Sequence, residues 1–255
     1  EMAMSLVITE QTSAIATVSL NRPEKLNAIN ADLVEAFYQA LLTINADPDI
    51  KVIILKGNGK AFCAGADLTG SDLDAEPNEP AARKEIERLQ DITRQLLGSN
   101  KIVIGAIHGW AVGAGMEWAL NCDFPIWAQS AKGFFPEAQW GLSVTGGVSA
   151  ILPAMVGPAK AKELILLGEK HSADDLYRLG IAWRVVPDDQ LMDEATTLAQ
   201  TLAKLHSRSL GDLKQGINLG AYGDIDKVLA FEIDATVAGA CDRSTLENIK
   251  SFAPQ

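Results

Sequence analysis

The sequence predicts an α/β fold, and three observations support this prediction. In the first half of the chain, β-like apolar runs alternate with helical patterns, as in residues 51–56 followed by 81–97. Two segments rich in glycine and alanine, 63–67 and 109–117, each follow such an apolar run. The second half of the chain is mainly helical in pattern. Because repeated strand-then-helix units need crossover connections, we expect an α/β core with a helical C-terminal region.

The elements follow one another in a regular order. Residues 5–9 and 15–20 alternate like a pair of strands. Asn30 and Asp32 are typical N-cap residues and precede a helical spacing of apolar residues that Pro48 ends. The remaining predictions are strands at 51–56, 102–107 and 181–186, a loop at 69–80, and helices at 81–97, 158–167, 173–179, 188–204, 209–219, 224–238 and 243–252.

Composition narrows the class of protein. The 255 residues are 47% hydrophobic and 22% charged, which is typical of a soluble globular protein, and no apolar run is long enough to cross a membrane. A net charge of −11 argues against a nucleic-acid binder, whose binding face is usually basic. Cys63, Cys122 and Cys241 are widely spaced, so we expect free thiols in a reducing compartment such as the cytoplasm. The sequence predicts no metal site, because it has no cysteine–histidine cluster.

The segments Cys63-Ala64-Gly65-Ala66-Asp67 and Gly109 to Glu117 leave their backbone N–H groups uncovered, because their side chains are small. Two such groups from separate turns can converge on one oxygen and form an oxyanion hole. Gly113-Ala114-Gly115 also stands where a helix would begin, and the first N–H groups of a helix have no partner within it. Taken alone, this segment also fits a tight turn without a ligand. It is no dinucleotide-binding fingerprint, because Trp118 replaces the third glycine.

Two glutamates near these segments stand in apolar surroundings. Glu117 lies between Met116 and Trp118, and Glu137 follows Phe134-Phe135-Pro136. An ordinary glutamate is a solvated surface charge. Burial would raise the pKa of these carboxyl groups and suit them to proton transfer near neutral pH. The two acids together with the two small-residue segments therefore indicate enolate chemistry on a carbonyl compound.

The chain resembles the enoyl-CoA hydratase/isomerase family, the crotonase superfamily. Four segments agree with the family in order and spacing: Asn21 to Ala28 (NRPEKLNA), Ala61 to Leu68 (AFCAGADL), Gly109 to Glu117, and Pro136-Glu137 followed by Gly146-Gly147. The resemblance implies a crotonase-like spiral of repeated ββα units in residues 1–200, which carries the active site. It also implies a helical trimerisation region in residues 201–255 and a homotrimer or a dimer of trimers.

The resemblance gives each site residue a role. Ala66 and Ala114 match the two positions whose N–H groups bind the thioester oxygen, although the family usually has glycine at the second position. Glu117 matches the acid that helps water attack the β-carbon, and Glu137 matches the acid that delivers a proton to the α-carbon. The implied contacts to the coenzyme A moiety are Lys25, Leu26, Ala28, Ala64, Asp67 and Leu68, and plausible phosphate partners are Arg22, Lys25 and Lys60.

The first functional hypothesis is an enoyl-CoA hydratase that adds water syn across the 2,3 double bond of an acyl-CoA thioester. Its substrate contains CoA, and it needs no cofactor, nucleic acid or membrane. A Δ3-Δ2 enoyl-CoA isomerase is an alternative that can run on Glu137 alone. A specialised crotonase, such as an aromatic hydratase-lyase, would place Trp110, Trp118 or Trp140 in its acyl pocket. An RNA-binding protein on the same fold is the alternative outside enzymes, and the negative charge opposes it.

Several other residues in the matching region are predicted to be structural. Asp67 and Asp123 are expected to pair locally, His108 to pack or form hydrogen bonds, and Cys63 to pack. The family often ends with a phenylalanine and a lysine that approach the CoA of a neighbouring subunit. Lys250 and Phe252 stand in the tail of this chain, without the usual Lys-Arg-x-Pro pattern.

Overall fold

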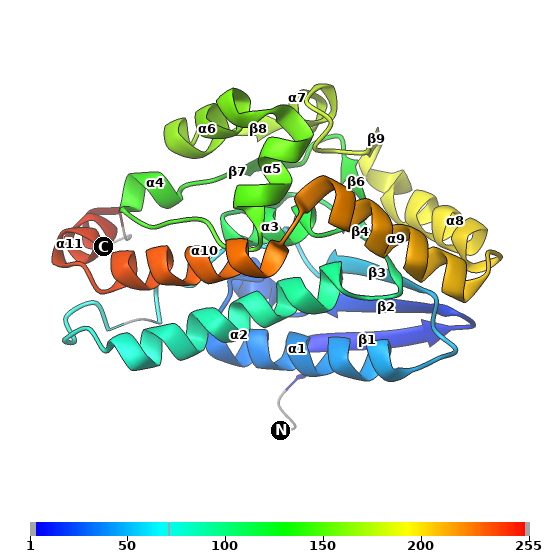
Figure 1. The fold of residues 1–255 in the computed structure, drawn as a ribbon, viewed down its shortest axis with the longest axis horizontal. Coiled ribbons are helices and arrows are strands. Elements are labelled where there is room, and N and C mark those ends of the chain that lie inside the picture. Colours follow the sequence, from blue (N-terminus) through cyan, green and yellow to red (C-terminus); the bar gives the residue numbers. More distant parts are fainter. Residues whose placement is uncertain (1–3, 71, 253–255) are drawn as a thin grey trace.

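A computed structural model describes residues 4–70 and 72–252 (Figure 1). Its larger sheet has six strands in the described residues, in the order β1-β2-β3-β4-β6-β9. The pair β1 and β2 is antiparallel, and every later pair of neighbours is parallel. The strands are Val7–Thr12 (β1), Ile15–Leu20 (β2), Val52–Gly57 (β3), Ile102–Ile107 (β4), Phe124–Ala128 (β6) and Arg184–Val186 (β9).

Helices connect and cover the parallel strands. Helix α1 (Ala31–Ala46) joins β2 to β3, α2 (Glu79–Leu97) joins β3 to β4, and α8 (Leu191–Ala203) packs against β3, β4 and β6. Every residue of β4 is buried, as expected for a strand inside a covered parallel sheet. The Asn30 side chain accepts from the Leu33 N–H at 2.9 Å, so the predicted N-cap of the first helix is confirmed.

A second, smaller sheet brings the site segments together. It contains β5 (Trp110–Val112), β7 (Lys132–Phe134) and β8 (His171–Ser172), and β5 runs parallel to β7. Helix α3 (Ala114–Leu120) begins just after β5, and α4 (Glu137–Trp140) begins shortly after β7. Because the carboxyl ends of neighbouring parallel strands meet at one edge, Glu117 and Glu137 are brought to the same region of the molecule.

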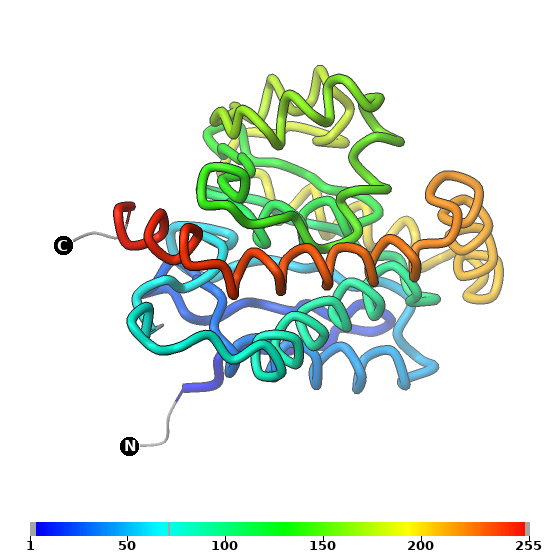
Figure 2. Tube along the Cα trace, turned by 60° about the vertical axis from the view of Figure 1, so that its left-hand side comes forward, coloured from blue at the N-terminus to red at the C-terminus, as the bar shows by residue number. Residues whose placement is uncertain are grey.

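The C-terminal half is built of helices that pack on this core. Figures 1 and 2 both show α10 lying along α2 on one side, with α4 and α5 on its other side. Residue 200, where the sequence divides the two predicted parts, lies inside α8. Trimerisation through residues 201–255 stays a prediction. The further helices are α5 (Val148–Val156), α6 (Pro158–Leu167), α7 (Ala173–Arg178), α9 (Ser207–Tyr222), α10 (Ile225–Ala240) and α11 (Arg243–Phe252), with 3-10 turns at Pro23–Lys25 (η1) and Asp188–Gln190 (η2).

Some elements differ from the sequence prediction. The first strand is displaced to β1, and the strand predicted over 181–186 is reduced to β9, because the Ile181 and Ala182 N–H groups donate to the Leu176 carbonyl at the end of α7. The helix predicted over 188–204 begins as the 3-10 turn η2 and becomes α8. Among the described residues, no helix has the length and hydropathy needed to cross a membrane.

Candidate active site

Backbone hydrogen bonds join the two small-residue segments side by side. The Phe62 N–H donates to the His108 carbonyl at 2.8 Å, and the Cys63 N–H donates to the Trp110 carbonyl at 3.0 Å. In return, the Val112 N–H donates to the Cys63 carbonyl at 3.0 Å. Residues 62–63 therefore run along β5 like an added strand, and the turns that follow each segment emerge next to each other.

Two glycines allow these turns to approach so closely. A Cβ atom on Gly115 would lie 2.3 Å from the Cys63 carbonyl oxygen, and one on Gly65 would lie 2.6 Å from the Val112 carbonyl oxygen. Gly65 also has a φ of +84°, which other residues rarely adopt. Any larger residue at either position would push the two turns apart.

Ala66 and Ala114 present the two backbone N–H groups expected at an oxyanion hole. Ala66 is exposed and Ala114 is half-buried, whereas their neighbours Gly65 and Gly115 are buried. Within residues 4–70 and 72–252, neither of the two alanine N–H groups donates a hydrogen bond. Ala114 is the first residue of α3, where an N–H group has no partner inside the helix. Both groups are thus free to bind a ligand oxygen.

Glu117 is a buried carboxylate with both oxygens held in place. Its side chain points toward the loop before α5, where the Thr145 N–H donates to Oε1 at 2.9 Å and the Thr145 hydroxyl donates to Oε2 at 2.5 Å. Burial raises the pKa of Glu117 well above its usual range, and the charge of Glu137 raises it further, while the two donors of Thr145 lower it. Nothing in the residues around Thr145 marks it as the partner of Glu117, so sequence reasoning missed this role.

Glu137 is equally buried but is held differently. It is the first residue of α4 and is 7% exposed. Its Oε2 atom is buried and has no hydrogen-bond partner among the described residues. Gly113 packs against the other oxygen, since a Cβ at Gly113 would lie 3.0 Å from Oε1. Burial raises the pKa of Glu137 to about 7.

The two carboxyl groups interact through their charges, so they titrate as a pair. Two negative charges in one buried site repel each other, and we therefore expect the pair to hold one proton near neutral pH. Thr145 gives Glu117 two donors that stabilise a carboxylate. Oε2 of Glu137 has no such donor among the described residues. The two carboxyl groups are therefore held differently, and the charge of Glu137 adds to the rise in the pKa of Glu117.

The residues expected to contact coenzyme A lie on two adjacent segments. The Ala64 N–H donates to the Leu26 carbonyl at 3.0 Å, the Ile29 N–H donates to the Gly65 carbonyl at 2.8 Å, and the Asp67 N–H donates to the Ile29 carbonyl at 2.9 Å. These bonds align residues 25–29 with residues 64–68 in one strip, which includes the Ala66 N–H group. The exposed members of the strip are Lys25 and Leu26, and the half-buried ones are Ala28, Ala64, Asp67 and Leu68.

Arg22 and Asp67 form an ion pair that holds this strip together. Arg22 Nη1 lies 2.6 Å from Asp67 Oδ2 and also donates to the Ala28 carbonyl at 3.0 Å. Hydrogen bonds from Thr69 and from Arg22 lower the pKa of Asp67 to about 2. The expected local pairing of Asp67 is confirmed. Arg22 already has two partners, whereas the other predicted phosphate partners, Lys25 and Lys60, are exposed.

Asp123, His108 and Cys63 were also predicted to have structural roles, and each is held by its surroundings. Asp123 Oδ2 lies 2.9 Å from Lys214 Nζ, and the His108 ring contacts the Gly59 carbonyl at 2.8 Å. Cys63 is fully buried, and burial raises the pKa of its thiol to about 12, so it is an inert packing residue.

Residues considered for the acyl pocket and the tail are placed as follows. Trp118 is buried in the core, where its ring packs edge-on against Phe37 at 5.0 Å between ring centroids, so it does not line an open pocket. Lys250 forms an ion pair with Asp74 of the same chain, and Phe252 is exposed. Contact of this tail with the CoA of a neighbouring subunit stays a prediction.

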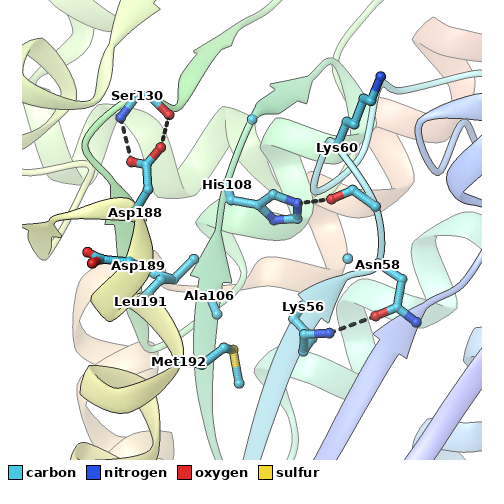
Figure 3. Close-up of a pocket in the computed structure, with 13 residues that line it drawn as sticks. Lys56, Asn58, Lys60, Ala106, His108, Ser130, Asp188, Asp189, Leu191 and Met192 are labelled. Carbon is cyan, nitrogen blue, oxygen red and sulfur yellow. Dashed lines mark hydrogen bonds between the residues drawn. The ribbon is translucent and has the colours of Figure 1, made fainter.

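A cavity of about 460 Å³, lined in part by Lys60, lies where β3 and β4 end next to the start of α8 (Figure 3). Several of its polar side chains are already paired: Lys56 Nζ donates to Asn58 Oδ1 at 2.7 Å, and Asp188 accepts from the Ser130 N–H at 3.0 Å. It contains none of the four predicted catalytic residues. In the described part of the chain, no three acidic, histidine or cysteine side chains are grouped to hold a metal ion.

Known proteins are similar to this chain over nearly its whole length. Residues 10–253 match the family described as enoyl-CoA hydratase/isomerase. A 1,2-epoxyphenylacetyl-CoA isomerase of Escherichia coli is 35% identical over 98% of this chain and 95% of its own length. A crotonyl-CoA hydratase of Syntrophomonas wolfei is 33% identical over 92% of this chain and 89% of its own length.

A solved structure confirms the fold. The enoyl-CoA hydratase/isomerase of Pseudoalteromonas atlantica superposes with a TM-score of 0.86 at 26% identity, covering 98% of this chain and 99% of that one. The fold class predicted from the sequence, a crotonase-like α/β fold with a helical C-terminal region, is therefore correct.

Proposed function

Because the chain belongs to the enoyl-CoA hydratase/isomerase family, we propose that it adds water syn across the 2,3 double bond of an enoyl-CoA thioester. One observation carries the proposal. Two buried carboxyl groups lie beside the same pair of turns, and they are held differently: Thr145 donates to both oxygens of Glu117, whereas Oε2 of Glu137 has no partner among the described residues. Hydration needs one base and one acid in such a place.

The proposed reaction begins with the thioester oxygen bound by the N–H groups of Ala66 and Ala114. The Glu117 carboxylate takes a proton from a water molecule while the water oxygen forms a bond to C3. The π electrons move toward C2 and the thioester carbonyl, and the resulting enolate is stabilised by the two N–H groups. Glu137 then gives its proton to C2. Glu117 ends protonated and Glu137 ionised, so a single proton must return from Glu117 to Glu137 before the next cycle.

The substrate class follows from the same family. We propose that the CoA moiety lies along the strip formed by residues 25–28 and 64–68, with Lys25 and Lys60 near its phosphates. CoA is then part of the substrate, and the proposed steps use no metal or redox cofactor. Two of the relatives act by name on CoA thioesters, which supports this choice. A homotrimer or a dimer of trimers remains the expected assembly, and analytical ultracentrifugation would test it.

Isomerisation of a 3-enoyl-CoA is the second candidate, and a specific observation favours it. Both oxygens of Glu117 are occupied by Thr145, whereas Oε2 of Glu137 is without a partner among the described residues. Glu137 in its ionised form would remove a proton from C2 and return it to C4, so that the double bond moves from C3–C4 to C2–C3. The relative from Escherichia coli is also named an isomerase.

One assay distinguishes these functions. The purified protein is incubated separately with crotonyl-CoA and with a 3-enoyl-CoA, and the ultraviolet absorbance of the conjugated enoyl thioester is followed, with products identified by mass spectrometry. Hydration removes the absorbance of crotonyl-CoA and gives a product heavier by one water. Isomerisation creates the absorbance from the 3-enoyl-CoA. Inertness toward short, long, branched and aromatic enoyl-CoAs, combined with salt-sensitive retention of RNA, would overturn the enzyme proposal.

A further inference from the structure

Another buried acid lies behind the site, on a helix near the C-terminal end of the chain. Glu232 is in the middle of α10 and is 0% exposed. Its Oε1 atom accepts from the Gly147 N–H at 2.7 Å, and its Oε2 atom accepts from the Ser149 N–H at 3.1 Å and from the Ser149 hydroxyl at 2.9 Å. Glu232 therefore holds the first residues of α5 and the glycine before them.

Gln90 of α2 completes this arrangement. Its Nε2 atom donates to Glu232 Oε1 at 3.2 Å, and its Oε1 atom accepts from the Gly146 N–H at 2.8 Å. From the other side, the Asn121 side chain donates to the Gly146 carbonyl at 2.7 Å. Side chains from α2, α10 and the end of α3 thus bind every residue between Thr145 and α5. The segment 145–149 is held as a rigid turn.

This turn is what holds Glu117. Thr145 donates from both its N–H and its hydroxyl to the Glu117 carboxylate. The next residue, Gly146, packs on the same side chain, since a Cβ at Gly146 would lie 2.7 Å from Glu117 Cβ. A shift of the turn would therefore move the two donors of Glu117.

We propose that Glu232 is a positioning residue for the Glu117 carboxylate, because it fixes the 145–149 turn from which Thr145 binds both Glu117 oxygens. The role rests on the proposed function, in which Glu117 activates water. Glu232 touches neither substrate nor reacting atoms. Its effect passes from α10 through Gly147 and Ser149 to Thr145.

The chemistry of the turn explains why an acid is needed at this position. Gly146 and Gly147 have φ values of +69° and +70°, and their N–H groups donate to side-chain oxygens of Gln90 and Glu232. A buried N–H group without an acceptor is costly. A carboxylate can accept several hydrogen bonds at once, whereas an amide has only one accepting oxygen. Replacing Glu232 by Gln would turn one accepting atom into a donor that faces other donors.

The first test compares E232Q with D234N. Asp234 lies on the same helix two residues further on, is exposed, and pairs with Arg83 at 2.9 Å, so it is a matched carboxylate outside the turn. We expect E232Q to lower kcat about tenfold or more, as small displacements of catalytic groups do, with KM and the affinity for a non-reactive acyl-CoA nearly unchanged. D234N should retain the wild-type kcat. An unchanged kcat in E232Q, or equal losses in both variants, would overturn the role.

A double-mutant cycle tests the proposed route through Thr145. If Glu232 acts by placing the Thr145 donors, E232Q should have a much smaller effect on kcat in a T145V background than in the wild type. Additive effects on kcat would show that Glu232 acts by another route and would overturn the proposal. Should E232Q fail to fold, S149A removes only one donor to Glu232. That variant should lower kcat about two- to threefold without a change in KM, by the loss of one hydrogen bond, and wild-type kcat would contradict the role.

Hydrogen exchange separates this inference from the proposed function. Amide exchange of the segment around residue 145 is measured by mass spectrometry for the wild type, E232Q and D234N, without any substrate. We expect faster exchange across this segment in E232Q alone, because the Thr145 N–H loses its fixed position. If the wild-type protein turns over no enoyl-CoA but this difference is seen, the proposed reaction fails and the placement of the turn by Glu232 stands. Unchanged exchange at Thr145 would overturn the placement itself.

Discussion

Glu117 and Glu137 are both buried carboxyl groups, but they differ in the hydrogen-bond donors that hold them. Glu117 has two donors from Thr145, and that residue belongs to a turn held by three helices. Glu137 begins a helix of four residues, and one of its oxygens has no partner among residues 4–70 and 72–252. Both are buried to a similar degree, so burial alone does not distinguish them.

In the reaction that we propose, this difference separates the base from the acid. Burial raises the pKa of each group, but hydrogen-bond donors stabilise the charged form and their absence leaves the neutral form favoured. A fixed carboxylate suits the activation of water, which needs a defined direction of attack. An unpartnered acid suits delivery of a proton to carbon. The experiments below change Glu137, Glu117, the pH or the Thr145 partner, one at a time.

The largest effect is expected from E137Q. A glutamine cannot donate a proton to carbon or remove one from it, so turnover should fall about a thousandfold in either enzymatic function. Binding of a non-reactive acyl-CoA, measured by calorimetry, should remain largely intact because the amide has a similar shape. E163Q, which neutralises an exposed carboxylate on α6, serves as the control. Turnover at the wild-type rate in E137Q would remove Glu137 from the mechanism.

The next largest effect is expected from E117Q, and it separates the two functions. A hydratase should lose about a hundredfold in kcat, because water is no longer activated by a carboxylate. An isomerase that relies on Glu137 should keep much of its activity. The rates of E117Q with crotonyl-CoA and with a 3-enoyl-CoA are measured side by side. Retention of full hydratase activity would contradict the assignment of Glu117 as the base.

The pH dependence of kcat/KM tests which form of Glu137 is active. Its pKa is raised to about 7, so the protonated form persists up to that pH and is lost above it. If Glu137 is the acid of a hydratase, kcat/KM should fall about tenfold per pH unit above pH 7. If it is the base of an isomerase, kcat/KM should instead rise through the same range. A profile without change between pH 6 and pH 8 would contradict both roles.

Among the substitutions of Glu137, Glu117 and Thr145, the smallest effect is expected from T145V. Valine keeps the backbone N–H that donates to Glu117 Oε1 but removes the hydroxyl that donates to Oε2. The loss of one hydrogen bond to a buried carboxylate should lower kcat about tenfold and should raise the pKa of Glu117. T197V, on the exposed side of α8, is a control for the substitution itself. A kcat equal to that of the wild type would show that the backbone donor alone suffices.

The sequence predicts the long elements better than the short ones. Long apolar or periodic segments such as α2 and β4 are found where expected. The strand β6 was missed because Pro125, which cannot donate to a neighbouring strand, stands in it. The strands β5, β7 and β8 have two or three residues, too few to show any alternation. Their pairing comes from contacts between distant parts of the chain.

The residues of the candidate site differ in the same way: some are predictable from the local sequence, and others depend on contacts between distant residues. The four predicted catalytic residues, Ala66, Ala114, Glu117 and Glu137, lie in short motifs that can be recognised from neighbouring residues in the sequence. Thr145, Gln90 and Glu232 act together only in three dimensions, since the latter two are 142 positions apart. The sequence does contain one indication of the role of Glu232. This residue stands on the apolar stripe of its helix with Leu229, Ile233 and Val237. A charged residue among buried positions is informative because it must have partners.

The site draws on almost the full length of the chain, from Leu26 beside Ala64 to Glu232 behind the 145–149 turn. Protein synthesis proceeds from the N-terminus, so both glutamates and both turns leave the ribosome well before α10 does. In the role we propose for Glu232, a nascent chain that ends before α10 holds every reacting group but lacks the support that aligns them. Catalytic competence is then among the last properties that the growing polypeptide acquires.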